Sequence, residues 1–219
     1  MINLVMVGTG AVAAEQTSYM KGTNYYNNNG ELIQLKGYLE YDYNIEKYYK
    51  TYKFTAPILG DIDSYTIAPD DYFAVAISNV AFRKSMIDKL IEKNAKFTNL
   101  VHPTSIIADT SSMGIGNIIA PFCMLGPNSR IGNYNILTTQ SLISHDSVIG
   151  DNNTFSTVIL CGHTHVGDSN TFGIRSTVIP DVLIGDNCLI QAGMVVDKNI
   201  PDGGTVFYKY KERIIALPQ

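Results

Sequence analysis

The sequence predicts two architectures in one chain of 219 residues: a small α/β unit over residues 1–100 and a parallel β-helix over residues 101–219. In the first part, strand-like and helix-like segments alternate, which favours a parallel sheet. From about residue 102 the helical period disappears and apolar residues recur at every sixth position, the spacing of a β-helix repeat. Apolar residues make up 45% of the chain and charged residues 16%, so the chain can bury a core and is not disordered.

The first hundred residues alternate buried-strand runs with helical segments. The stretch INLVMVG is typical of a buried strand, and it runs into a Gly turn that opens a helix, GTGAVAAEQTSYM. The expected strands are 2–8, 32–40, 72–78 and 97–101, and the expected helices are 8–20 and 79–95. Asn79 is placed to cap the second helix. Outside the strand at 32–40, residues 20–53 are rich in Tyr and Asn, and we expect a long loop there with no more than one short helix.

The six-residue repeat predicts the geometry of the second part. A small residue stands two positions before most of the repeated apolar residues, and Gly often follows them. The repeated positions are Ile107, Met113, Ile119, Leu125, Ile131, Leu137, Ile143, Ile149, Phe155 and Cys161 and, after one five-residue step, Val166, Phe172, Val178, Ile184, Ile190 and Val196. Three such hexads form one triangular coil of 18 residues, so residues 18 apart are expected to stack at the strand spacing of about 4.8 Å.

The three cysteines fit this pattern as buried, reduced thiols. Cys123 and Cys188 fall at the small inward position, and Cys161 falls at the apolar one. Their odd number and wide separation argue against a disulfide framework. We therefore expect free thiols inside the prism.

His145 and Asp146 stand together inside a hexad. His145 is two residues after Ile143, where the side chain points outward, and an imidazole suits proton removal at neutral pH. A neighbouring carboxylate can orient such a ring and stabilise its protonated form. His163 is two residues after Cys161 and is expected one coil above His145, beside the shortened step that ends near His165. The alternatives are surface histidines without a role and a zinc site made of the three histidines.

Several classes of function are disfavoured by composition. The formal net charge is −4 and no basic run is present, so nucleic acid is not an expected partner. No apolar run reaches the roughly 18 residues of a membrane span. The apolar start is short and lacks a basic leader, so we expect a cytoplasmic protein.

The motifs resemble one family of hexapeptide-repeat enzymes. The stretches NLVHPTSIIADTSSMGIGNIIAP, SLISHDSVIGD, CGHTHVGD, FGIRSTVIPDVLIGD and IQAGMVVDKNIPDG look like the sialic-acid O-acetyltransferase family. Its close relatives are the N-acetyltransferases of nucleotide-linked 4-amino sugars of the bacillosamine, perosamine and viosamine types. The resemblance covers nearly the whole chain and is strongest over residues 98–203.

The resemblance implies a Rossmann-like N-terminal domain that binds a nucleotide-sugar and a C-terminal left-handed parallel β-helix. It implies a homotrimer with acetyl-CoA in the groove between neighbouring β-helices and no bound metal. It implies that His145 is the general base supported by Asp146, without an acyl-enzyme. The family's second histidine, near the acetyl carbonyl, is either lost here or replaced by His163, which we count among the candidate acetyl-CoA contacts. The implied acetyl-CoA contacts are Gly173, Ile174, Ala192 and Gly193, and the implied nucleotide-sugar contacts are Gly8, Gly10, Glu40 and Asn79.

The chain also departs from the family. Bacillosamine-type enzymes carry a second histidine in the coil after the base, and the best match here is Thr154. The family's G-x-x-G-H-G loop is GTGAV, without the histidine, although backbone amides at a helix N-terminus still suit a phosphate. The usual C-terminal G-x-P-A-K is replaced by YKYKER, where Lys209 and Lys211 could serve a phosphate.

The expected function is therefore acetyl-CoA-dependent N-acetylation of a nucleotide-linked amino sugar. O-acetylation of a sugar hydroxyl, as on sialic acid, is the first alternative, because sequence does not separate an amine from a hydroxyl acceptor. Transfer of another acyl or a formyl group, a metal-dependent hydratase and a non-catalytic scaffold are further alternatives.

Overall fold

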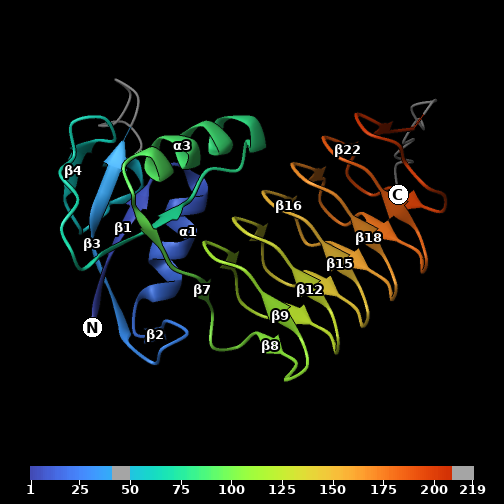
Figure 1. Cartoon of the computed structure of the whole chain (residues 1–219), viewed down its shortest axis with the longest axis horizontal. Coiled ribbons are helices and arrows are strands. Elements are labelled where there is room, and N and C mark those ends of the chain that lie inside the picture. Colours follow the sequence, from blue (N-terminus) through green and yellow to red (C-terminus); the bar gives the residue numbers. More distant parts are fainter. Residues whose placement is uncertain (41–49, 209–219) are drawn as a thin grey trace, which may run out of the picture.

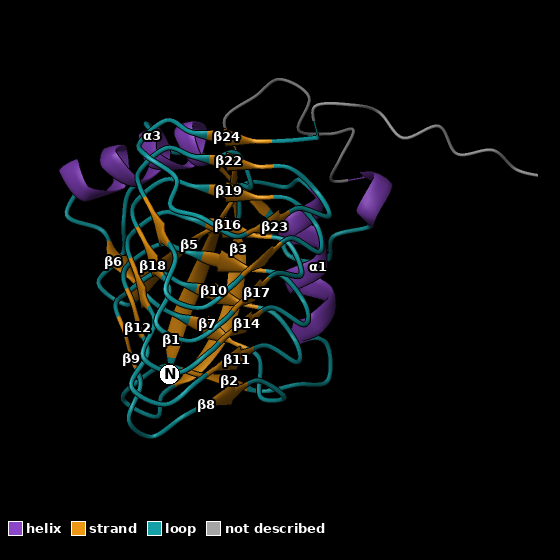
Figure 2. Ribbon diagram, turned by 90° about the vertical axis from the view of Figure 1, so that its right-hand side faces the viewer, coloured by secondary structure: helices purple, strands orange, loops and turns teal. Residues whose placement is uncertain are grey.

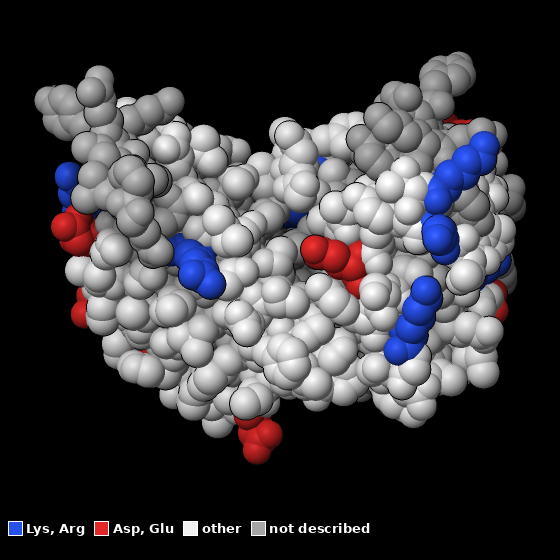
Figure 3. Space-filling model, turned by 180° about the vertical axis from the view of Figure 1, so that it is seen from behind, with Lys and Arg blue, Asp and Glu red and all other residues white. Residues whose placement is uncertain are grey.

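The computed structural model describes residues 1–40 and 50–208, in which an N-terminal α/β unit is followed by a parallel β-helix (Figure 1). The β-helix predicted from the six-residue repeat is confirmed. On the face shown in Figure 3, several Lys and Arg side chains lie near one another at the right-hand end of the view, and another lies separately towards the left. Within the described ranges, no helix combines the length and apolarity that a membrane crossing requires.

The N-terminal unit is built on one six-stranded sheet, here called sheet A. Its elements are β1 (Ile2–Val7), α1 (Ala11–Met20), β2 (Tyr25–Tyr26), β3 (Leu32–Glu40), β4 (Ile58–Asp61), β5 (Asp71–Val75), α3 (Val80–Glu92) and β6 (Lys96–Phe97). The strand order is β2-β3-β1-β5-β6, with β4 on β3. All pairs are parallel except β2 with β3, as the strand–helix alternation predicts.

Sheet A is buried on both faces, which explains its continuous apolar strands. Along β1, Leu4 and Met6 enter one apolar cluster, whereas Val5 and Val7 enter another, because neighbouring side chains of a strand point to opposite faces. The first cluster contains residues of α1 and three residues of the β-helix: Leu100, Ile118 and Ile136. The second contains the apolar side of α3. The β-helix therefore forms part of the cover of sheet A.

The β-helix has three parallel sheets, here called B, C and D. Sheet B contains β7 (Leu100–Val101), β10 (Ile118–Ile119), β13 (Ile136–Leu137), β16 (Thr154–Phe155), β19 (Thr171–Phe172), β22 (Leu189–Ile190) and β24 (Thr205–Val206). Sheet C contains β8 (Ile106–Ile107), β11 (Met124–Leu125), β14 (Leu142–Ile143), β17 (Ile159–Leu160), β20 (Thr177–Val178) and β23 (Val195–Val196). Sheet D contains β9 (Ser112–Met113), β12 (Arg130–Ile131), β15 (Val148–Ile149), β18 (His165–Val166) and β21 (Leu183–Ile184). In Figure 2 the strands β19, β22 and β24 stack in one column.

A column of buried asparagines joins the coils inside the prism. Each side-chain oxygen accepts a hydrogen bond from the backbone N–H of the equivalent residue in the next coil, at 2.6–2.9 Å. The column is Asn99, Asn117, Asn135, Asn153 and Asn170, and it ends on the N–H of Cys188. The small residues two positions before the apolar ones are therefore not merely small, because at this corner they carry the bonds that hold one coil to the next.

A second column explains the repeated Gly-Asp pairs. The carboxylate Oδ1 of Asp168 accepts the N–H of Asp151 at 2.7 Å, and Asp186 and Asp202 repeat the contact in the next coils. A Cβ added at Gly150 would lie 2.1 Å from Oδ1 of Asp168. Glycine is needed there because the carboxylate of the next coil fills the space that a side chain would take.

The shortened coil lies one hexad earlier than expected. Ile143 pairs with Leu160, and Leu160 pairs with Val178, so Leu160 and not Cys161 is the inward apolar residue. The missing residue therefore lies in the turn from sheet B to sheet C, between Phe155 and Leu160. Both candidate residues are apolar, and the six-residue count alone chose the wrong one. Cys161 is consequently half-buried rather than a core thiol, whereas the burial expected for the other two cysteines is confirmed.

Two further expectations about the first hundred residues are wrong in detail. The stretch 97–101 is not one strand, since Phe97 ends β6 of sheet A and Leu100 begins the first strand of sheet B. The segment expected to be a loop contains β2, and a strand not expected from the sequence, β4, follows it. Residues 50–52 are helical, and residues 41–49 lie outside the described part.

Replacement of Asn135 by Leu tests the asparagine column. The Asn135 side chain accepts the N–H of Asn153 and donates to the carbonyl of Gly150, at 2.8 and 3.0 Å. Its loss should lower the free energy of unfolding by about 2–4 kcal/mol, because each buried polar group left unpaired costs roughly 1–3 kcal/mol. Urea unfolding measures the change. Asn28→Leu, at an exposed turn, is the control, and equal stability of the two variants would contradict a structural role for the column.

Candidate active site

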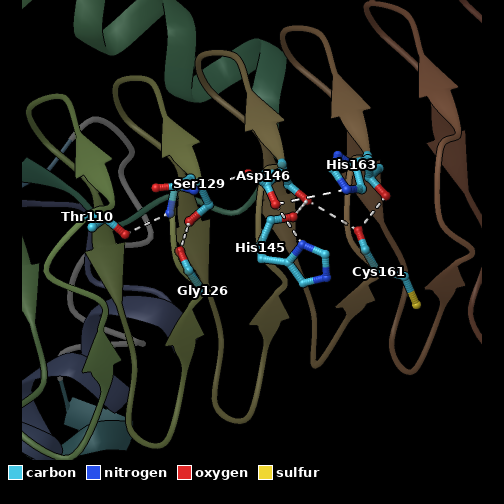
Figure 4. A network of polar contacts seen from close by, with 10 residues as sticks. Thr110, Gly126, Ser129, His145, Asp146, Cys161 and His163 are labelled. Atoms are coloured by element: carbon cyan, nitrogen blue, oxygen red, sulfur yellow. Dashed lines mark hydrogen bonds and ion pairs between the residues drawn. The ribbon is translucent and has the colours of Figure 1, made fainter.

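His145 and Asp146 lie at the corner where the chain passes from sheet C to sheet D. Asp146 has a φ of 58°, a left-handed conformation that Asp tolerates better than most residues. This bend lets two neighbouring side chains meet, although neighbours in a strand point to opposite faces. Nδ1 of His145 lies 2.8 Å from Oδ2 of Asp146, and both side chains are partly exposed (Figure 4).

The same corner aligns one polar side chain from each coil. Asn128 lies 18 residues before Asp146 and donates through Nδ2 to its Oδ1 at 3.2 Å. The backbone N–H of Asn128 donates to Oγ1 of Thr110 at 3.0 Å. His163 follows in the next coil, with Nε2 3.9 Å from Oδ2 of Asp146. Asp146 is thus held from two sides, by His145 and by Asn128.

His163 lies at the same corner as His145 and one coil on, as expected, but it does not lie directly over His145. His163 and Asp146 share the left-handed corner conformation, so His163 stacks on Asp146. Gly162 instead lies over His145, and a Cβ added to Gly162 would be 2.5 Å from Cε1 of the ring. The two imidazoles meet edge to face with ring centres 5.3 Å apart. The change follows from the position of the shortened coil, which moves the residues between Phe155 and Val166 by one place.

Electrostatics at the corner favour an ionised Asp146. The hydrogen bond from His145 is the largest cause that lowers the pKa of Asp146, and the hydrogen bond from Asn128 is the next. A carboxylate that stays ionised can hold the Nδ1–H tautomer of His145, which leaves the Nε2 lone pair to take a proton.

The corner also offers three ligand atoms that could hold a metal ion. One atom each from His145, Asp146 and His163 lie within 4.8 Å of one another. His165 lies on β18 of sheet D and does not belong to this group. The zinc site of three histidines considered from the sequence is therefore wrong, because Asp146 takes the place of His165. Two imidazoles and a carboxylate are a donor set that zinc accepts.

Two of the expected nucleotide-sugar contacts, Gly8 and Glu40, come together at the carboxyl edge of sheet A. Gly8 follows β1 with a φ of 99°, and its N–H donates to the carbonyl of Leu39 at 2.8 Å. Thr9 donates to the buried carboxylate of Glu40 at the end of β3. Gly10 caps α1 with an ordinary φ of −74°. Among the described residues, none comes within 4 Å of a Cβ added at Gly10.

A hollow of about 550 Å³ lies at this edge and is lined by Glu40, Asp61, Ile62, Asp63, Phe82, Met86 and Lys89. Asn79, also expected to contact substrate, caps α3 by accepting the N–H of Phe82 at 2.9 Å. The side-chain oxygen of Asn79 therefore has a structural role as the cap of α3.

The expected acetyl-CoA contacts lie at a different corner from His145. Gly173 and Ile174 follow β19, and Ala192 and Gly193 follow β22, so all four lie where the chain turns from sheet B to sheet C. Within one chain, the strands of sheet C separate this corner from His145. Lys209 and Lys211 lie outside the described residues.

Thr154, the best match to the family's second histidine, lies inside the contact between the two parts of the chain. It lies on β16 of sheet B and is 4% exposed, and its hydroxyl donates to the carbonyl of Ser78 at 3.0 Å. It therefore belongs to the contact between the β-helix and the N-terminal unit, away from the His145 corner.

Known structures share this architecture. PerB from Caulobacter crescentus, solved with CoA and GDP-perosamine, matches over 93% of this chain and 92% of its own, with a TM-score of 0.76 and 21% identity. WeeI from Acinetobacter baumannii AYE matches over 94% and 96%, with a TM-score of 0.77 and 21% identity. The acetyltransferase domain of PglB from Neisseria gonorrhoeae FA1090, solved with acetyl coenzyme A, matches over 93% and 94%, with a TM-score of 0.74 and 18% identity.

The chain shares the parallel β-helix fold of these sugar acetyltransferase structures. No family model matches it. A stretch of 45 residues, 20% of this chain, is 40% identical to YvoF, a proposed acetyltransferase of Bacillus subtilis (strain 168). The match spans 26% of that protein, so this chain covers about a quarter of the length of the curated relative it matches.

Sequence reasoning missed three residues of the two candidate sites. Asn128 could have been found by counting 18 residues back from Asp146. Gly162 required the right position for the short coil, and the pair Ile159–Leu160, which matches the two-residue strands of the other coils, was the available signal. Asp61 of the hollow is the last residue of β4, a strand that was not expected from the sequence.

Removal of the His145 ring should raise the pKa of Asp146 toward its ordinary value, because the largest lowering cause is lost. Asn128→Ala should raise it by less. Carboxyl ¹³C shifts followed through a pH titration measure both. With a lowered folded pKa, the stability that Asp146 contributes is present above its ordinary pKa and is lost as the pH falls through the folded value. An unchanged Asp146 titration in His145→Ala would exclude the His145–Asp146 bond in solution.

Proposed function

We propose that this chain is an acetyl-CoA-dependent N-acetyltransferase that acts on the amino group of a nucleotide-linked amino sugar. In this proposal, a Rossmann-like domain of residues 1–100 holds the nucleotide-sugar, and the β-helix of residues 101–219 holds acetyl-CoA. His145 is the general base and Asp146 orients it.

The observation that carries the proposal is the His145–Asp146 pair, 2.8 Å apart on an exposed corner of a fold that other proteins use with CoA. PerB was solved with both CoA and GDP-perosamine, and histidine variants of the perosamine N-acetyltransferase were solved with the same two molecules. A base on an outward corner can reach two bound molecules that lie outside the prism.

The chemistry needs one proton acceptor and one path for the leaving thiol. The amine attacks the thioester carbonyl, Nε2 of His145 takes a proton from the nitrogen, and the carbon–sulfur bond breaks as the amide forms. The proton then passes to the CoA thiolate, which leaves as the thiol. Asp146 stabilises the imidazolium between these steps. Such a base contributes about 10²–10⁴-fold to the rate.

The carboxyl edge of sheet A supports the nucleotide-sugar part of the proposal. Ligands of open parallel sheets bind beyond the carboxyl ends of the strands. The N-terminus of α1 at Gly10 suits a phosphate, and the buried Glu40 suits a hydroxyl donor such as a ribose.

An apolar column on sheet C supports a homotrimer. The outward residues of this sheet stack in register, and five of the six are apolar: Ile106, Met124, Leu142, Ile159, Thr177 and Val195. Ile106 and Val195 are each 64% exposed in the single chain. We propose that a neighbouring copy covers this column and that acetyl-CoA lies along its rim. His145 of one copy and the corner with Gly173, Ile174, Ala192 and Gly193 of its neighbour would then share one acetyl-CoA molecule.

Acetyl-CoA turnover tests the function directly. Released thiol would be followed with UDP-, GDP- and dTDP-linked 4-amino sugars and free sialic acid, with and without a chelator. Turnover of one nucleotide-linked amino sugar, unaffected by the chelator, is the expected result. Turnover of sialic acid alone would indicate O-acetylation, and activity lost to the chelator would indicate a metal at His145, Asp146 and His163. Absence of both CoA binding and turnover would exclude the acetyltransferase.

His145→Ala should lower kcat by about 10²–10⁴-fold and leave the Kd of acetyl-CoA unchanged, because the base acts on the acceptor proton. Steady-state kinetics and calorimetry measure the two quantities. His165→Ala, an exposed histidine on sheet D, is the matched control and should keep full activity. Full activity of His145→Ala at neutral pH would remove His145 from the mechanism.

Ile159→Asp should convert the trimer into monomers, because it places a charge in the middle of the apolar column. Light scattering coupled to gel filtration measures the mass. Ile91→Asp changes an isoleucine of similar exposure on α3 and should leave the mass unchanged. A wild-type protein that runs as a monomer would refute the trimer.

A further inference from the structure

Arg83 is a buried arginine between the two parts of the chain. It belongs to α3, is 1% exposed, and points into the wall of the β-helix. Its guanidinium donates four hydrogen bonds. The acceptors are Oδ1 and the carbonyl of Asn152, Oγ1 of Thr154 and the carbonyl of Ile77, at 2.7–2.8 Å.

All four acceptors are neutral oxygens, so this cation has no carboxylate among the partners that the described residues provide. Burial lowers the pKa of Arg83 to about 9, and the group is still protonated at neutral pH. A buried charge is an expensive way to hold two surfaces together, since well-packed apolar residues do so at lower cost. The bonds of a planar guanidinium, however, fix orientation, because they require a fork of acceptors in defined places.

The acceptors of the Arg83 hydrogen bonds belong to the two candidate sites: the carboxyl edge of sheet A and the coil of His145. Ile77 follows β5 at the carboxyl edge of sheet A, two residues before Asn79. Asn152 and Thr154 lie in the coil that begins at Ile143 and carries His145. The contact is doubled from the β-helix side, since Asn152 donates to the carbonyl of Val80 at 2.9 Å.

We propose that Arg83 is a positioning residue that sets the carboxyl edge of sheet A relative to the coil of His145. The inference rests on the proposed function: a nucleotide-linked acceptor anchored at that edge presents its amino group to His145 only when the two parts keep one orientation. Arg83 touches neither substrate nor reacting atoms. It acts through Asn152, Thr154 and the segment before α3.

This positioning role predicts a specific kinetic pattern for variants of Arg83. Each ligand binds mainly to one part, so loss of Arg83 should leave both binding constants intact. The transfer step needs both parts in register, and a misplacement of about 1 Å can cost on the order of 10²-fold in rate. A residue that merely held the protein together would lower binding, stability and turnover in parallel.

Arg83→Met and Arg83→Lys in the full-length protein test the proposal. For Arg83→Met, we expect kcat at saturating substrates to fall about 10–100-fold, while calorimetric Kd values for acetyl-CoA and for the nucleotide-sugar change less than twofold. Arg83→Lys should recover part of the loss. Lys84→Met is the matched control, because Lys84 is an exposed neighbour paired with Asp88 and should leave all three quantities unchanged.

Thr154→Val provides a milder variant if Arg83→Met does not fold. It removes one acceptor of the guanidinium at nearly constant volume and should lower kcat severalfold, again without a change in either Kd. A folded Arg83→Met, or in its place a folded Thr154→Val, overturns the inference if it keeps wild-type kcat or loses binding together with kcat. Absence of turnover in the wild type would instead overturn the proposed function, and the two failures are therefore distinguishable.

Discussion

The register between successive coils is the constraint on which the rest of this molecule depends. Side chains hold the register from inside and outside the prism: the asparagines of the inner column bind the next backbone N–H, and the aspartates of the Gly-Asp pairs do the same at another corner. Because each such bond spans one coil, the position of a corner residue follows from the residue 16 to 18 positions before it. The meeting of His145, Asp146, Asn128 and His163 at one corner is a direct result.

Much of the architecture could be predicted because it repeats. A six-residue period is visible from Ile107 to Val196, and it placed His145 outward beside an acidic neighbour. The errors arose where the repeat is interrupted. Leu160 and Cys161 are both acceptable apolar residues by pattern, and only strand pairing decides between them. That one-residue error was enough to put His163 over His145 instead of over Asp146.

Other features could not be predicted because they depend on contacts far apart in the sequence. Arg83 has the pattern of an ordinary charged residue in an amphipathic helix, and nothing local indicates that 69 residues later Asn152 accepts its hydrogen bond. The acidic hollow has the same origin, since Asp61 and Glu40 become neighbours only when β4 pairs with β3. The α/β unit and the β-helix are joined by apolar contacts on both faces of sheet A and by this buried arginine, so the orientation of the two parts is a tertiary property.

The shortened coil has a consequence for how such a protein changes over evolutionary time. One residue is missing from the turn between Phe155 and Leu160, yet the strands on either side pair in the same arrangement as those of the complete coils. Length variation is thus absorbed within a corner and is not passed on to the inward residues of the prism. Insertions and deletions at corners can therefore reshape the outer surface, while the stacked frame and its hydrogen-bond columns stay the same. The inward residues and the hydrogen-bond columns hold the coils together, whereas the corner segments can change in length and sequence.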